Sequence, residues 1–116
     1  MSEVTLYHNP RCSKSRQTLA LLEARDLTID IVLYLETPPD PVTLKRLLEQ
    51  LGMAPRELMR KKEAPYAELN LGDADKDQAT LIQAMSDHPI LIERPIVVAN
   101  GKAALGRPPE NVLEIL

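Results

Sequence analysis

Apolar and polar residues alternate over residues 3–7 ("EVTLY"), and this alternation predicts a strand. Residues 13–25 then have helical spacing, with Leu19 and Leu22 on one face. Residues 27–35 ("LTIDIVLYL") are rich in β-branched residues and predict a second strand. A strand, a helix and a strand in such quick succession form a βαβ unit, so we expect the two strands to be parallel.

The middle of the chain, residues 36–88, predicts a helical insert. Asp40 is expected to cap a helix that has Pro41 in its first turn and ends at Gly52. Its apolar positions follow the i, i+3, i+4, i+7 rule: Leu44, Leu47, Leu48 and Leu51. Short helices are predicted around residues 55–62 and 64–70. A longer helix at about 75–87 carries Leu81, Ile82 and Met85.

The last part of the chain predicts a strand, a hairpin and a helix. "PILIERPIVVANGKAALG", residues 89–106, predicts a strand followed by a hairpin that turns at Asn100-Gly101. "PPENVLEIL" predicts a final helix with Leu113 and Leu116 facing inward. The order β-α-β, helical insert, β-β-α predicts an α/β chain with a thioredoxin-like fold and a mixed four-stranded sheet. We expect one domain over residues 1–116.

Composition narrows the possible functions. The chain has no Phe or Trp and three Tyr, so its core must be aliphatic. The net charge of −3 argues against general nucleic-acid binding, which needs a basic face. The N-terminal residues do not have the pattern of a secretory signal, and no run of about 20 apolar residues could cross a membrane. We therefore expect a cytoplasmic protein with no membrane partner.

Cys12 is the only cysteine, so no internal disulfide can form, and no metal site is expected. It lies in "YHNPRCSKSRQTL", where a strand end, a turn and a helix start are predicted. A helix N-terminus favours the thiolate through its unpaired N–H groups and its dipole. Arg16 at i+4, His8 across the turn, and the hydroxyls of Ser13 and Ser15 are placed to add to this effect.

Simpler interpretations of these residues stay open. A lone cysteine is often buried and inert, although the flanks of Cys12 are polar and charged. Arg11 and Lys14 are most simply solvated charges, and Arg16 fits that interpretation as well as a role beside the sulfur. A helix N-terminus also binds oxyanions. The stretch therefore indicates attack on an oxyanion, or exchange with an acidic thiol such as glutathione.

"HNPRCSKSR" resembles the H-N-P-x-C-x-x-S-R motif of arsenate reductases of the glutaredoxin-linked type. The resemblance continues in order through "LYLETPPD", "ELMRKKEAPYAEL", "HPILIERPIVV" and "GRPPENVLEIL". The chain ends without the C-terminal tail of the longer members, so it resembles the short, chromosomal branch of the family.

The resemblance implies a role for each matching position. Cys12 matches the nucleophile, and His8 matches the histidine that assists thiolate formation. Arg60, Arg94 and Arg107 match three arginines that bind the oxyanion.

Four further residues match supporting positions of the family. Asn9, Ser15 and Arg16 match the motif. Pro95, after Arg94, matches the proline that is typically cis in thioredoxin-like folds.

The implied activity is the reduction of arsenate to arsenite, as in arsenic resistance, through a covalent thioarsenate on Cys12. Glutathione would be the co-substrate and glutaredoxin the protein partner, with no bound cofactor. A single cysteine fits this scheme, because an external thiol must then complete the reaction.

Three alternatives remain at this stage. The chain could be a glutathione-dependent thiol oxidoreductase without physiological arsenate activity. It could be a regulator similar to the Spx-type RNA-polymerase-binding proteins, but Ser15 stands where those have the second cysteine of C-x-x-C. Finally, the thiol could be incidental to the function.

Overall fold

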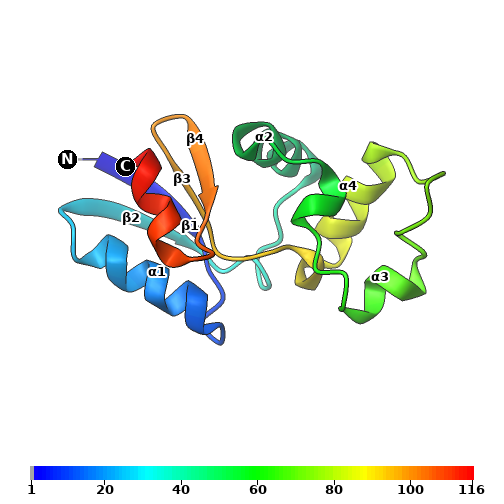
Figure 1. Cartoon of the computed structure of the whole chain (residues 1–116), viewed down its shortest axis with the longest axis horizontal. Helices are drawn as coiled ribbons and strands as arrows, with labels where there is room; N and C mark the ends of the chain where they lie inside the picture. Colours follow the sequence, from blue (N-terminus) through cyan, green and yellow to red (C-terminus); the bar gives the residue numbers. More distant parts are fainter. Residues whose placement is uncertain (1) are drawn as a thin grey trace. The chain divides into compact units, whose positions relative to one another are not determined.

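The computed structural model describes residues 2–116. Its elements, in chain order, are β1 (Ser2–Tyr7), α1 (Ser13–Glu23), β2 (Leu27–Val32), α2 (Pro41–Leu51), η1 (Pro55–Leu58), α3 (Ala64–Glu68), α4 (Gln78–Asp87), η2 (Pro89–Leu91), β3 (Ile96–Ala99), β4 (Lys102–Leu105) and η3 (Pro109–Ile115), where η marks a 3₁₀ helix. They form two compact units (Figure 1). The sheet unit comprises the chain up to Thr37 together with Arg94–Leu116, and the helical unit is Pro38–Glu93.

The sheet unit contains a four-stranded mixed sheet with the strand order β2-β1-β3-β4. β1 and β2 are parallel, in a register that pairs Val4 with Ile29 and Leu6 with Ile31. β3 runs antiparallel to both β1 and β4. The structure thus confirms the predicted βαβ unit and the mixed sheet.

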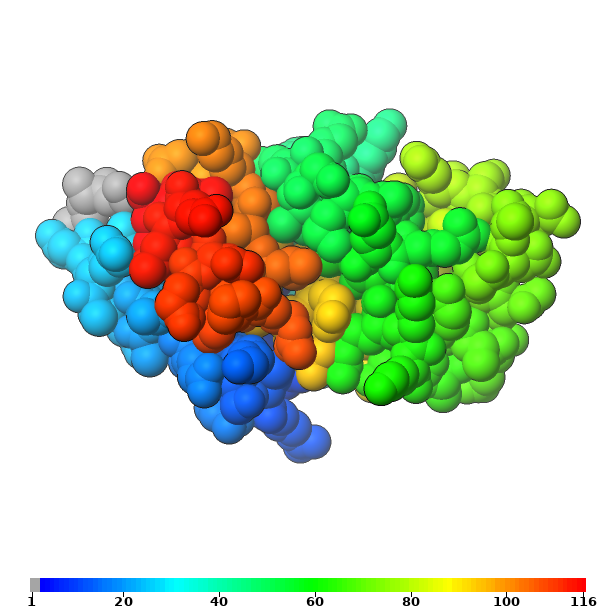
Figure 2. All heavy atoms as spheres, viewed as in Figure 1, coloured from blue at the N-terminus to red at the C-terminus, as the bar shows by residue number. Residues whose placement is uncertain are grey.

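The core of this unit lies on one face of the sheet. Alternate residues of β1 and β3 point to that face and pack with one residue from α1 and one from η3. The buried set is Val4, Leu6, Leu22, Val97, Ala99 and Val112. Helices α1 and η3 pack side by side over this face (Figure 1). In Figure 2 the red and orange atoms of the C-terminal segment adjoin the blue atoms of the α1 region. The aliphatic core is as predicted.

The β3–β4 hairpin turns where the sequence predicts. Asn100 and Gly101 both have positive φ, at 56° and 75°. Two successive left-handed residues are typical of a type I′ turn, whose twist matches that of the flanking strands.

The helical unit begins with the predicted cap. The Asp40 side chain accepts a hydrogen bond from the Thr43 N–H at 2.8 Å, and Pro41 opens α2. The helix ends at Gly52, which is left-handed with φ of 68°. The buried residues of α2 and α4 include most of the predicted apolar positions: Leu44, Leu47, Leu48, Leu81, Ile82 and Met85. Leu51, which was also predicted, is half-buried.

The prediction of a strand at the start of "PILIERPIVV" is wrong for its first residues. Pro89–Leu91 forms the 3₁₀ helix η2, in which the Leu91 N–H donates to the His88 carbonyl at 2.9 Å. Proline has no N–H for a strand ladder but suits the first position of a helix. Only Ile92 pairs as a strand does, in an isolated bridge with Met59.

The second strand and the last helix also differ from the pattern. β2 ends at Val32, because the N–H groups of Glu36 and Thr37 both fold back to the Leu33 carbonyl at 2.9 Å. The last helix, η3, has 3₁₀ geometry. With about three residues per turn, a 3₁₀ helix points different residues inward than an α-helix does. As a result Val112 is fully buried, while Leu113 and Leu116 are half-buried.

Over residues 2–116, no helix has the length and apolar character needed to cross a membrane.

The left-handed end of α2 leads to a stability prediction. Gly52→Ala should lower the free energy of unfolding by about 1 kcal/mol, because a β-carbon is strained at positive φ. Urea denaturation followed by circular dichroism measures the change. The matched control is Gly72→Ala, since Gly72 has no positive φ and an added β-carbon would meet only the Tyr66 side chain, at 3.3 Å. Equal losses in the two variants would contradict the prediction.

Candidate active site

The turn between β1 and α1 places Cys12 at the N-cap of the helix. The His8 N–H extends the ladder by donating to the Val32 carbonyl at 2.9 Å. The chain then folds tightly, because the Cys12 N–H donates to the Asn9 carbonyl at 3.0 Å. The Asn9 side chain accepts from the Arg11 N–H, also at 3.0 Å. Cys12 has extended backbone angles, φ −96° and ψ 125°, and its carbonyl accepts the first helical bond, from Arg16.

The surroundings of the sulfur favour the thiolate. Burial raises the pKa of the Cys12 thiol, but this effect is outweighed. The backbone N–H groups of Ser15 and Lys14 face the sulfur, and the Arg94 guanidinium adds a positive charge and a hydrogen bond. These groups bring the pKa below its ordinary value. Cys12 as a whole is half-buried.

His8 lies against Ser15. The sequence suggested that His8 pairs with the Cys12 sulfur, but the hydrogen bond of its ring is to Ser15. His8 Nδ1 and Ser15 Oγ are hydrogen-bonded at 2.6 Å, and both residues are buried. Ser15 Oγ also accepts the Asn9 N–H at 3.0 Å. Burial, together with the nearby charge of Arg16, lowers the pKa of His8. The neutral ring is therefore favoured, and His8 braces the turn that holds Cys12.

Arg16 supports the same turn. Its Nη1 donates to the Pro10 carbonyl at 2.9 Å, and its side chain is exposed. The pKa of Cys12 is lowered by Arg94, and the effect of the Arg16 charge falls on His8. The sequence left Arg16 open as a solvated charge or as a partner of the sulfur; in the structure it is an exposed charge that also braces the turn.

The second side of the site is built by the segments that flank the β3–β4 hairpin. The Arg94–Pro95 bond is cis, as predicted, and Pro95 is buried. Arg107 follows β4, and its Nη1 donates to the Arg94 carbonyl at 3.3 Å. The structure therefore places the Arg94 guanidinium beside Cys12 and the Arg107 guanidinium beside the backbone of Arg94.

Arg60 belongs to the helical unit. Its backbone N–H donates to the Leu91 carbonyl at 2.7 Å, beside the Met59–Ile92 bridge. Its guanidinium pairs with the carboxylates of Glu63 at 2.9 Å and Glu93 at 3.7 Å. The side chain is about a quarter exposed, at 26%. The third predicted arginine is thus held by two carboxylates within its own unit.

Two residues near the site were not predicted from the sequence. Gly106, directly before Arg107, is buried and donates its N–H to the Pro95 carbonyl at 3.0 Å. Thr18 is fully buried in α1, and its hydroxyl donates to the Lys14 carbonyl at 2.8 Å. Neither residue has a chemical signature in the sequence that marks it as part of the site.

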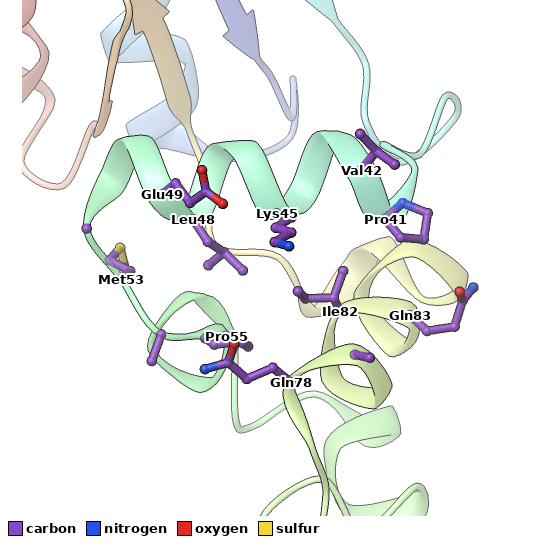
Figure 3. A pocket seen from close by; sticks show the side chains of 13 residues that line it. Pro41, Val42, Lys45, Leu48, Glu49, Met53, Pro55, Gln78, Ile82 and Gln83 are labelled. Atoms are coloured by element: carbon purple, nitrogen blue, oxygen red, sulfur yellow. The ribbon is translucent and has the colours of Figure 1, made fainter.

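A groove of about 760 Å³ lies in the helical unit, between α2, η1 and α4 (Figure 3). Leu48 and Ile82 approach its floor from opposite helices, with Lys45 and Glu49 on α2. None of the predicted site residues lines it. Among residues 2–116, no group of three or more His, Cys, Asp or Glu side chains could hold a metal ion.

Comparison with known proteins extends the resemblance seen in the sequence. The sequence profile of the ArsC family matches residues 7–115. A protein of Escherichia coli strain K12, named uncharacterized protein YfgD, is 62% identical over 98% of this chain and 97% of its own length. A protein of Neisseria meningitidis, named arsenate reductase, is 51% identical over 100% of both chains.

A solved structure gives the same result for the fold. The structure titled arsenate reductase from Vibrio cholerae superposes with a TM-score of 0.96 at 57% identity. The superposition covers 99% of this chain and 98% of that one. The match confirms the predicted thioredoxin-like α/β fold.

The surroundings of the sulfur predict the pH dependence of its alkylation. Thiolate formation at Cys12 should have a midpoint below the value of about 8.5 for a free cysteine. Arg94→Gln should raise this midpoint, because burial then opposes ionisation with only the backbone N–H groups against it. A rise of about one pKa unit would slow alkylation roughly tenfold at low pH. Iodoacetamide rates between pH 5 and 9 measure it. Arg11→Gln, an exposed neighbour, is the control, and equal profiles for the two variants would contradict the assignment to Arg94.

The lowered pKa of His8 leads to a predicted pH dependence of the free energy of unfolding. Its pKa is lowered in the folded protein, so the unfolded chain takes up the proton at higher pH than the native chain does. The free energy of unfolding should therefore fall as pH drops through about 6.5. His8→Asn, which can keep a polar contact with Ser15, should reduce this loss. Denaturation between pH 7 and 5.5 tests it, with His88→Asn as control; a slope that disappears in the control instead would refute the assignment.

Proposed function

This chain belongs to the ArsC family, and we propose that it reduces arsenate to arsenite with Cys12 as the nucleophile. The observation that carries the proposal is the thiol at the N-cap of α1, whose pKa is lowered by two backbone N–H groups and by Arg94. The thiolate is the reactive form of cysteine, and a helix N-terminus also attracts oxyanions. The names of the relatives at 51% and 57% identity support arsenate as that oxyanion.

Arsenate would bind beside the sulfur. The forks of Arg94 and Arg107 match the geometry of oxyanion oxygens, and the N–H groups of the first turn of α1 supply further donors. Arg60 is the third arginine that the resemblance assigns to the oxyanion. For it to take part, its guanidinium must share its donors between the substrate and the carboxylates of Glu63 and Glu93.

The first chemical step is nucleophilic. Cys12 Sγ attacks arsenic, a sulfur–arsenic bond forms, and one arsenic–oxygen bond breaks. The oxygen leaves as water after protonation, so a thioarsenate remains on Cys12 with arsenic still pentavalent. The arginines stabilise the negative charge that develops on the remaining oxygens.

The reduction needs a second thiol, and this chain has one cysteine. Glutathione attacks next, and glutaredoxin resolves the mixed intermediate. In sum two thiols are oxidised to a disulfide, and their two electrons reduce arsenic to the trivalent state as arsenite leaves. We place this reaction in the cytoplasm, where glutathione keeps thiols reduced. The chain itself then needs no bound cofactor.

Replacing the nucleophile tests the proposal. Cys12→Ser should lower arsenate reduction at least a thousandfold, because an alcohol is a far weaker nucleophile than a thiolate and gives no electrons. The assay measures arsenite formation with purified chain, glutathione and glutaredoxin, omitting each in turn. Arg11→Gln, which changes an exposed neighbour of Cys12, should keep its activity.

The outcomes separate the proposal from its alternative. Full activity of the Cys12→Ser variant would contradict the covalent scheme. A wild-type chain that reduces glutathione mixed disulfides but no arsenate would identify a glutathione-dependent thiol oxidoreductase. Arsenite formation without glutaredoxin would remove that partner from the mechanism.

A further inference from the structure

Three residues pack closely together next to the two arginines of the sheet unit. Gly106 contacts Thr18 of α1 and Pro95 of the cis peptide. A β-carbon at Gly106 would lie 2.7 Å from Pro95 Cγ and closer still to Thr18 Oγ1. Real β-carbons essentially never approach other atoms that closely. Any side chain at this position would therefore force its surroundings or its own backbone to shift, for lack of space and not because of its backbone angles.

The two neighbours of Gly106 have little freedom to move. Thr18 is fully buried, and its hydroxyl is held by the Lys14 carbonyl at 2.8 Å. Pro95 is a rigid ring in a buried segment, and its carbonyl accepts the Gly106 N–H at 3.0 Å. An added methyl group would consequently displace the backbone at Gly106 away from α1 and from Pro95.

Such a displacement would reach the arginines directly. Arg107 is the next residue after Gly106, and its Nη1 donates to the Arg94 carbonyl at 3.3 Å. Arg94 precedes Pro95, and its guanidinium acts on the Cys12 sulfur. The same α1 that carries Thr18 begins at Cys12. Gly106 therefore joins the helix that presents the thiol to both segments that present the arginines.

We propose that Gly106 is a positioning residue whose missing side chain lets α1, Arg94 and Arg107 close together around Cys12. It touches no reactant itself. Its effect on the thiol is independent of the substrate, and its effect on an oxyanion rests on the proposed function.

The test compares Gly106→Ala with wild type by the pH dependence of Cys12 alkylation. The variant should shift the thiol titration upward, slowing alkylation roughly three- to tenfold below the titration midpoint, which corresponds to about half to one pKa unit. Sulfate, a non-reducible oxyanion, should protect Cys12 in wild type. The half-protecting sulfate concentration should rise roughly tenfold in the variant, as expected when charge-assisted hydrogen bonds are lost.

A matched control separates positioning from loss of stability. Gly101→Ala lies at the other end of the same hairpin, where the strain comes from a φ of 75° and an added β-carbon would meet nothing within 4 Å. It should lower the melting temperature without changing the alkylation profile. An equal shift of the profile in both glycine variants would overturn the proposal, and so would an unchanged profile in Gly106→Ala.

The contact with α1 is tested in a second background. Thr18→Ala removes the closest obstacle, so Gly106→Ala should shift the titration less in that background than in wild type. Only part of the shift should be relieved, because the Pro95 ring remains. Equal shifts in both backgrounds would overturn the proposal. If Gly106→Ala does not fold alone, the double variant is compared with Thr18→Ala; failure of both to fold also refutes it, since the proposal requires a displaced but folded site.

This experiment does not depend on arsenate. If the wild type shows sulfate protection and the expected glycine effect but reduces no arsenate, the proposed function fails and the role of Gly106 stands. If arsenate is reduced and Gly106→Ala leaves the thiol titration unchanged, the proposed function stands and the role of Gly106 is refuted.

Discussion

A buried hydrogen bond between His8, at the end of β1, and Ser15, in the first turns of α1, fixes how the strand passes into the helix. Because Ser15 Oγ also holds the Asn9 N–H, one hydroxyl ties down both ends of the turn that contains Cys12. This geometry determines where the sulfur lies relative to the N–H groups of the helix. A protonated His8 would be buried beside the Arg16 charge, and the lowered pKa avoids that cost. The neutral, bonded ring is thus a condition for the rest of the site.

The second constraint is the close contact of Gly106, directly after β4, with Thr18 of α1 and with Pro95. The antiparallel pairing of β3 with β4 places Arg94 and Arg107 at one end of the hairpin, and the turn at Asn100-Gly101 is at the other end. Strand pairing alone would leave these two arginines near each other but not near the thiol. The link to the thiol comes from Gly106, the residue after β4, which lies against Thr18 of α1 and against Pro95 because it has no side chain. The site is therefore assembled by local turns and by core packing, and charge attraction is not what brings its parts together.

Much of this arrangement could be predicted from the sequence, because it depends on local signals. The alternation of apolar and polar residues predicted β1. Asp40 and Gly52 marked the two ends of α2, and Asn100-Gly101 marked the hairpin turn. The errors lie where the apolar pattern did not determine the backbone geometry. Pro89–Leu91 is apolar like a strand but follows proline into a 3₁₀ turn, and the final helix has 3₁₀ geometry that buries Val112. The role of His8 could not be read from its spacing to Cys12, because spacing does not tell which of two nearby polar groups a buried ring will bond. Gly106 was missed because a requirement for empty space leaves no chemical signature in one sequence.

The distribution of charge shows why an acidic chain can still stabilise an anionic sulfur. The net charge is −3, so the field of the whole protein does not favour a thiolate or an oxyanion. The groups that lower the pKa of Cys12 are two backbone dipoles and one guanidinium, all at short range. Short-range dipoles held by the fold are screened little by salt and cost little to reorganise when negative charge develops. Exposed charges such as Arg11 contribute little by comparison, because solvent screens them. The rigidity of the turn and of the hairpin contact is therefore itself part of the electrostatics, since the same groups set a few tenths of an ångström away would stabilise the thiolate less.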